Sequence, residues 1–130
     1  GKANDTHMSP TLLDGVTREM RLWREESFGP VKAIIRVHRE EEALAVANDS
    51  EYGLSAAVYS RDSARAWNVA QRLHTGICHI NGPTVHDEAQ MPFGGCKASG
   101  YGRFGGRAGI AEFTELRWIT IQTQPRELPF

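Results

Sequence analysis

Residues 55–81 read SAAVYSRDSARAWNVAQRLHTGICHIN, and this stretch predicts a strand, a helix and a second strand in succession. We expect the first strand at 55–59 and the second at 76–81. Asp62 is the expected cap of a helix that runs through residue 74, because its side chain can accept a hydrogen bond from the first helical turn. A unit of this kind predicts two parallel strands joined by a right-handed crossover.

A further strand and helix precede this unit. Residues 31–37 are rich in β-branched side chains and follow Pro30, as expected of a buried strand. Residues 39–48 carry three glutamates in the first turn, where they favour the positive end of a helix dipole, and then alanine and leucine. The whole pattern predicts an α/β fold with one parallel βαβαβ sheet. Residues 1–30 predict a loop with at most a short strand near 21–23.

The rest of the chain predicts a loop and one last strand. Residues 82–106 form a long glycine-rich loop, and loops of this length within a domain are usually functional. A short segment at 108–113 follows it. Residues 116–123 predict a strand with apolar side chains on both faces, which must be covered and paired. We therefore expect a homo-oligomer formed through this strand, whose apolar residues are Leu116, Trp118, Ile119 and Ile121.

Composition excludes several classes of protein. The chain has 130 residues, of which 40% are hydrophobic and 24% charged, which is typical of one globular domain. Its formal charge of -1 and scattered basic residues argue against a nucleic-acid partner, and no long apolar run predicts a membrane span. With two cysteines and no secretory pattern at the N-terminus, we expect a cytoplasmic protein with reduced thiols.

Two carboxylates precede the strand at 31–37, in Glu25-Glu26-Ser27-Phe28-Gly29-Pro30. Composition alone favours a solvated turn. The alternative is a binding role, in which a carboxylate at the mouth of a sheet accepts hydrogen bonds from a ribose and the aromatic ring two residues later lies against a flat cofactor ring. Both interpretations stay open on these residues alone.

Three motifs in order resemble the aldehyde dehydrogenase superfamily. Residues 25–31 resemble its Glu-Glu-x-Phe-Gly-Pro-Val motif, and residues 48–54 its Asn-x-x-x-Tyr-Gly-Leu turn. Asn81 followed by residues 92–100 resembles its Asn...Pro-Phe-Gly-Gly-x-Lys-x-Ser-Gly motif. The resemblance covers roughly residues 10–124 and is strongest to salicylaldehyde and related aromatic aldehyde dehydrogenases. It implies a partial catalytic domain at 1–113 and an oligomerisation strand with a tail at 114–130.

The resemblance also implies roles for single residues. Glu26 matches a glutamate that bonds the nicotinamide ribose, and Phe28 an aromatic residue near the nicotinamide. Phe93 matches an aromatic residue of the aldehyde pocket. Asn81 and Glu115 match structural positions, the latter near a subunit interface. Where many relatives place a proton-relaying glutamate after Gly102-Arg103, this chain has Phe104, so that role has no carrier there.

The nucleophile and the general base of the family precede the Glu-Glu-x-Phe-Gly-Pro motif by a long stretch, and only about two dozen residues precede it here. The resemblance therefore implies a fragment that lacks both groups and the Rossmann domain, and we expect no catalytic residue and no turnover from the isolated chain. NAD or NADP is expected in the parent enzyme, without tight binding to this fragment. The alternative is a non-catalytic, self-associating module.

Other candidate sites have simpler explanations. Cys78 is expected to be an inert core thiol, with His79 on the opposite face of its strand, and Cys96 an incidental free thiol. Residues 100–105 satisfy the dinucleotide fingerprint but do not lie between a strand and its crossover helix. We expect no metal site, because no pair among the ligand-type residues His79, His86, Asp87 and Glu88 stands at a recognised spacing.

Overall fold

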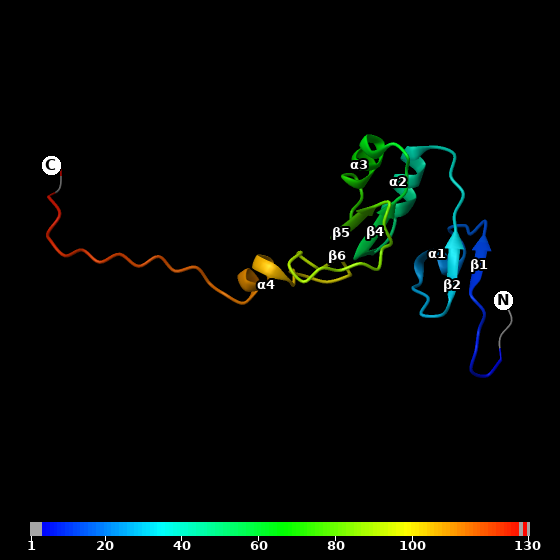
Figure 1. Ribbon diagram of the computed structural model, residues 1–130, viewed down its shortest axis with the longest axis horizontal. Helices are drawn as coiled ribbons and strands as arrows, with labels where there is room; N and C mark the ends of the chain where they lie inside the picture. Colours follow the sequence, from blue (N-terminus) through cyan, green and yellow to red (C-terminus); the bar gives the residue numbers. More distant parts are fainter. Residues whose placement is uncertain (1–3, 128, 130) are drawn as a thin grey trace.

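The computed structural model describes residues 4–127 and 129. In chain order its elements are β1 (Thr11–Asp14), α1 (Arg21–Arg24), β2 (Val31–Ile34), α2 (Glu40–Asn48), β3 (Tyr52–Gly53), β4 (Ser55–Val58), α3 (Ser63–Ala70), β5 (Ile77–Ile80), β6 (Cys96–Lys97) and α4 (Gly106–Glu112). Helices α2 and α3 lie on the same side of the central strands, and the chain after α4 runs away from the body as an extended segment (Figure 1). The fold is α/β, as predicted.

The central unit is β4–α3–β5. The two strands pair in parallel, with Ser55 opposite Ile77 and Val58 opposite Ile80. Helix α3 begins at the predicted cap, where a carboxylate oxygen of Asp62 accepts a hydrogen bond from the backbone N–H of Arg65 at 3.0 Å. The predicted strand–helix–strand unit is thus confirmed, although the helix ends at Ala70 and not at residue 74.

The single βαβαβ sheet was a wrong prediction for this chain. Strand β2 pairs in parallel with β1 and not with β4, so the parallel strands form two separate pairs. The reason is that residues 11–14, predicted as loop, supply β2 with a partner of their own. Residues 21–23, predicted as a short strand, belong to helix α1, whose first residue Arg21 forms an ion pair with Glu25 one turn later at 2.7 Å.

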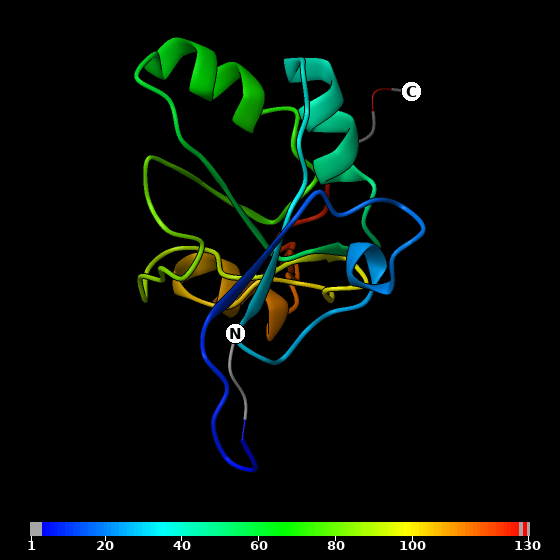
Figure 2. The same ribbon diagram turned by 90° about the vertical axis from the view of Figure 1, so that its right-hand side faces the viewer.

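Helix α2 confirms the prediction at 39–48 and is fastened to α3 (Figure 2). Glu40 forms an ion pair with Arg65 at 2.6 Å, and Glu41 pairs with Arg72. At the other end of α2, the Asn48 side chain accepts a hydrogen bond from the backbone of His74 at 2.8 Å. The acidic first turn of α2 therefore also binds its neighbour, since one carboxylate pairs with α3 and another with the turn that follows α3.

The glycine-rich segment 82–106 folds back onto the turn after α2. Strand β6 pairs antiparallel with β3, with Tyr52 opposite Lys97 and Gly53 opposite Cys96. Nearer the ends of the segment, Phe93 and Phe104 exchange two backbone hydrogen bonds of 2.8 and 2.7 Å. Two of the sequence motifs, 48–54 and 92–100, are thereby brought into direct contact.

The interior of this chain is small. Among the described residues the buried apolar side chains are Val16, Leu44 and Ala66, while many large apolar side chains face outwards. Burial of apolar surface is the main stabilising contribution in a globular domain. The exposed apolar surface is therefore of the kind that normally faces more polypeptide.

The last strand predicted, 116–123, is not formed in this structure. Its backbone is extended but has no strand partner, and Trp118 is 90% exposed. A strand needs a neighbour for its N–H and C=O groups, and the described part of this chain offers it none. Pairing with another copy stays a prediction. No helix among residues 4–127 and 129 is both long enough and apolar enough to cross a bilayer.

Candidate functional site

A first cavity opens beside the segment that precedes β2. It has a volume of about 730 Å³ and is lined by the segment 23–26, by Ser50, by residues 52–56 and by Ala98 and Ser99 of the glycine-rich loop, among others. Glu26 lies at this cavity, and its side chain has no hydrogen-bond or ion-pair partner among the described residues. The carboxylate is therefore free to accept hydrogen bonds from a ligand.

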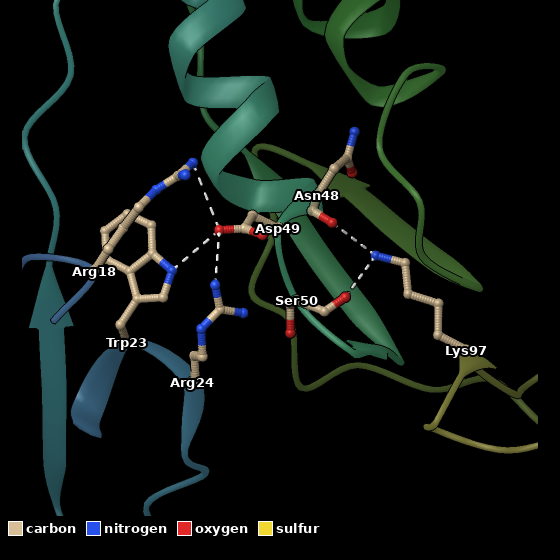
Figure 3. A network of polar contacts seen from close by, with 7 residues as sticks. All are labelled: Arg18, Trp23, Arg24, Asn48, Asp49, Ser50 and Lys97. Atoms are coloured by element: carbon tan, nitrogen blue, oxygen red, sulfur yellow. Dashed lines mark hydrogen bonds and ion pairs between the residues drawn. The ribbon is translucent and has the colours of Figure 1, made fainter. Parts of the chain in front are cut away.

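A polar network fixes the wall of this cavity (Figure 3). One oxygen of Asp49, directly after α2, accepts a hydrogen bond from the indole N–H of Trp23 at 3.3 Å. The same oxygen lies 3.6 Å from the guanidinium of Arg18 and 3.7 Å from that of Arg24. The Arg18 guanidinium also lies 5.6 Å from the centre of the Trp23 ring, at the distance of a cation–π contact. Asp49 thus holds the segment that leads to Glu26.

A second set of hydrogen bonds joins the turn after α2 to the glycine-rich loop (Figure 3). The ammonium group of Lys97 donates hydrogen bonds to the carbonyl oxygens of Asn48 and Ser50, at 3.0 and 2.9 Å. Lys97 has a positive φ of 56°, which turns the loop at this point. The sequence did not predict the network around Asp49, because nothing in the order of residues shows that positions 18, 23 and 24 meet the end of α2.

Replacing Asp49 with alanine is expected to destabilise the folded chain by about 1 kcal/mol, because a half-buried acceptor for an indole N–H and two guanidinium groups is removed. Urea unfolding of the 130-residue chain measures this. Asp87→Ala is the matched control, since Asp87 is exposed and has no side-chain partner among the described residues. Equal stability of the two variants would contradict a fastening role for Asp49.

A second cavity, of about 420 Å³, lies beside β5. It is lined by the strand itself, by the first part of the glycine-rich loop and by Phe93. His79 and His86 face each other there with their rings edge to face and 5.6 Å between ring centres. An Nε2 atom of His86 lies 3.3 Å from a carboxylate oxygen of Glu88. This cavity combines aromatic and polar walls.

The two cavities separate the residues for which the motifs predicted a joint role. Glu26 lies at the first cavity and Phe93 at the second, whereas Phe28 is 94% exposed and lies outside both. The roles that the resemblance implies for these three side chains require one common hollow, and this chain on its own does not form it. The physical reason is the small interior, since the surfaces that carry these side chains have no polypeptide packed against them.

The residues predicted to have structural or interface roles fall into two groups. Asn81, at the end of β5, has a positive φ of 57° and exchanges two hydrogen bonds with the backbone of Ser60, both at 2.9 Å. It therefore fastens β5 to the turn after β4. Glu115, Trp118, Ile119 and Ile121 lie in the exposed C-terminal segment.

Both cysteines are free thiols of intermediate exposure. Cys78 lies in β5, and burial raises the pKa of its thiol. The Cys96 thiol donates to the carbonyl oxygen of His74 at 3.2 Å. Cys78 is thus less deeply buried than a core residue, but desolvation of its thiolate still opposes its use as a nucleophile.

Alkylation of Cys78 should be slow in the folded chain. Because the pKa of this thiol is raised, the midpoint of its rate against pH should lie above the ordinary cysteine value of about 8.5. The measurement is iodoacetamide labelling of a Cys96→Ser variant, folded and in urea. Identical pH profiles in the two conditions would contradict the burial.

The dinucleotide fingerprint at 100–105 lies between turns and precedes α4, and no strand opens into it. Its last glycine serves close packing, since a Cβ on Gly105 would lie 2.2 Å from the carbonyl oxygen of Met91. Phe104 uses its backbone to pair with Phe93. The described residues contain no group of three or more side chains able to hold a metal ion.

A parallel βαβ unit with a packed glycine-rich loop and two open cavities places this chain among the α/β proteins. The chain belongs to the aldehyde dehydrogenase family, whose model matches residues 1–119. It is 63% identical to a vanillin dehydrogenase of Pseudomonas fluorescens, over 99% of this chain and 27% of that protein.

Solved structures show the same relationship. The chain superposes on a salicylaldehyde dehydrogenase from Pseudomonas putida G7, complexed with salicylaldehyde, with a TM-score of 0.91 and 51% identity, over 100% of this chain and 27% of that one. An aldehyde dehydrogenase of Mycobacterium tuberculosis complexed with NAD+ gives a TM-score of 0.77 and 42% identity, over 82% of this chain and 22% of that one. The chain thus spans about a quarter of the length of these relatives.

Proposed function

We propose that this chain acts as part of a longer NAD(P)-dependent aldehyde dehydrogenase that oxidises an aromatic aldehyde, such as salicylaldehyde or vanillin, to its carboxylic acid. The observation that carries the proposal is the match in fold and motifs, along the whole chain, to an enzyme whose structure holds salicylaldehyde. The vanillin dehydrogenase relative supports the same class of substrate.

Glu26 at the first cavity and the exposed Phe28 two residues later fit a nicotinamide cofactor. Glu26 presents a carboxylate without a protein partner, and the Phe28 ring is almost fully exposed, so a hydrogen-bond acceptor and a flat apolar surface are both available. In the proposed enzyme Glu26 accepts hydrogen bonds from the nicotinamide ribose and Phe28 packs beside the ring. When bound, NAD(P) supplies the hydride acceptor. The relative that contains NAD+ supports the choice of cofactor.

The aldehyde is assigned to the side of Phe93. An offset contact between its ring and an aromatic substrate contributes roughly 0.5–1.5 kcal/mol. The cysteine nucleophile and the general base are expected on polypeptide outside this chain, because Cys78 is poorly suited to the task and Cys96 donates its thiol hydrogen to a backbone carbonyl. In this proposal the chain binds and orients the cofactor and the aldehyde, and residues outside the chain perform the reaction.

A chimera tests the proposal, with this chain in place of the matching 27% of the Pseudomonas putida G7 enzyme. We expect NADH formation from salicylaldehyde or vanillin by the chimera and none from the isolated chain. A folded chimera that oxidises no aldehyde would refute the proposal. Turnover that co-purifies with the 130-residue chain would refute the proposal that the catalytic residues lie outside it.

A self-associating module without chemistry is the second candidate. Its support is the exposed C-terminal segment, in which Leu116, Trp118, Ile119 and Ile121 have no cover among the described residues. In such a module the segment pairs with another copy of the chain and gives a homo-oligomer.

Removal of residues 114–130 is therefore expected to convert an oligomer into a monomer. Light scattering at micromolar concentration measures the mass of the full chain and of the truncated chain. Because burial of each large apolar side chain stabilises by roughly 1.5–3 kcal/mol, a Trp118→Ser, Ile119→Ser double variant should weaken association in the same direction. A monomeric mass for the full chain would contradict self-association.

A further inference from the structure

The second cavity contains a polar group that the proposed aldehyde site leaves unexplained. The Nε2 atom of His79 is buried and has no hydrogen-bond partner among the described residues. A buried polar atom without a partner is destabilising, and such atoms in native proteins commonly await a ligand or a water. His79 lies on β5 and contributes to the wall of the same cavity as Phe93.

A second imidazole stands opposite the first. His86, from the glycine-rich loop, meets the His79 ring edge to face at 5.6 Å between centres. Its Nε2 atom lies 3.3 Å from a carboxylate oxygen of Glu88. Because an ionised carboxylate can only accept, a hydrogen bond at this contact places a proton on Nε2, and in the neutral imidazole this leaves Nδ1 of His86 as an acceptor.

Together these two imidazoles and the carboxylates of Asp87 and Glu88 form the polar part of a cavity whose remaining walls are largely aromatic and apolar. Phe93, Pro92 and Met91 supply the apolar walls, while the two imidazoles supply hydrogen-bonding nitrogens. The cavity volume of about 420 Å³ lies within the range of small-molecule sites. A neutral hydroxyl group can both donate and accept, so it can pair with the Nε2 atom of His79 in either tautomer of that ring.

We propose that His79 and His86 recognise a hydroxyl group on the ring of the aldehyde, so that the enzyme prefers phenolic over unsubstituted or methyl-substituted aromatic aldehydes. This inference rests on the proposed function, because it takes the cavity at Phe93 as the aldehyde site. Glu88 is a positioning residue that sets the orientation of His86. A site built to bond a hydroxyl discriminates against an analogue that lacks it, because the buried nitrogen is then left unpaired.

The test compares kcat/KM of the chimera for matched substrates: salicylaldehyde with 2-methylbenzaldehyde, and 4-hydroxybenzaldehyde with 4-methylbenzaldehyde. His79→Phe and His86→Phe should each lower the preference for the hydroxyl compound roughly tenfold in at least one pair, as expected for one hydrogen bond. His86→Asn, which can still hydrogen-bond, should retain more of the preference than His86→Phe. His38→Phe, a histidine at a different cavity between α2 and α3, is the matched control and should leave the ratio unchanged.

The outcomes separate this inference from the proposed function. An active chimera whose ratio is the same with and without the two histidines would overturn the recognition of a ring hydroxyl while leaving aldehyde oxidation intact. A folded chimera that oxidises none of the four aldehydes would overturn the proposed function, and the inference with it. Because the ratio compares two substrates on one protein, a partial loss of folded enzyme does not change it.

Discussion

Replacing Gly76 with alanine should disrupt the packing of the glycine-rich loop and unfold much of the chain around β5. A Cβ at this position would lie 1.9 Å from the carbonyl oxygen of Gly94 and 2.9 Å from the Cα of Gly95. These are backbone atoms, so no side-chain rotation can relieve the clash. Overpacking typically costs about 1–3 kcal/mol, and we expect a loss at or above the top of this range.

The same substitution should also reduce catalysis in the chimera, because displacement of Gly94 and Gly95 moves Phe93 on one side and Lys97 on the other. Urea unfolding of the 130-residue chain and turnover of the chimera are the two measurements. Gly82→Ala is the matched control, since its nearest new contact, the Cβ of His79 at 3.7 Å, is an ordinary van der Waals distance. A Gly76→Ala variant as stable as the Gly82→Ala variant would show that the loop packs elsewhere.

Replacing Glu26 with glutamine should lower kcat/KM for NAD in the chimera roughly 10- to 100-fold, while leaving stability unchanged. The loss follows from the strength of hydrogen bonds to a charged acceptor, about 1.5–3 kcal/mol. Stability is unaffected because the Glu26 side chain has no partner among the described residues. Steady-state kinetics at varied NAD, together with urea unfolding, separate the two effects.

The neighbouring carboxylate provides the control for this experiment. Glu25 forms an exposed ion pair with Arg21 at 2.7 Å, which holds the pKa of the Glu25 carboxyl below its usual range. Glu25→Gln removes a charge one residue away and should leave the cofactor kinetics unchanged. Equal losses in the two variants would point to the general charge of the segment and would contradict a specific role for Glu26.

Local patterns predicted the elements that depend on local physics. Asp62 caps α3 as expected, and the acidic start at 40–42 marks α2, because capping and helix propensity act within a few residues. Strand pairing depends on distant segments. Residues 11–14 therefore could not be predicted as the partner of β2. The apolar pattern at 116–123 predicted a strand, but it could not show that the described residues contain no partner for that strand.

The candidate site was predictable only as far as its motifs. Residues 25–31, 48–54 and 92–100 identified the family, and the structure brings the last two into contact through β3 and β6. The Asp49 network and the paired rings of His79 and His86 arise from tertiary packing, so no spacing in the sequence announces them. The expected meeting of Glu26, Phe28 and Phe93 requires surfaces that this chain does not supply by itself.

The most direct test of the account is a crystal structure of the chimera with NAD and salicylaldehyde bound. The account predicts that the Glu26 carboxylate lies within hydrogen-bonding distance of the nicotinamide ribose, that Phe28 packs beside the nicotinamide and that the Phe93 ring lies against the aldehyde. A structure in which the cofactor and the aldehyde occupy a cleft that none of these three side chains reaches would contradict it.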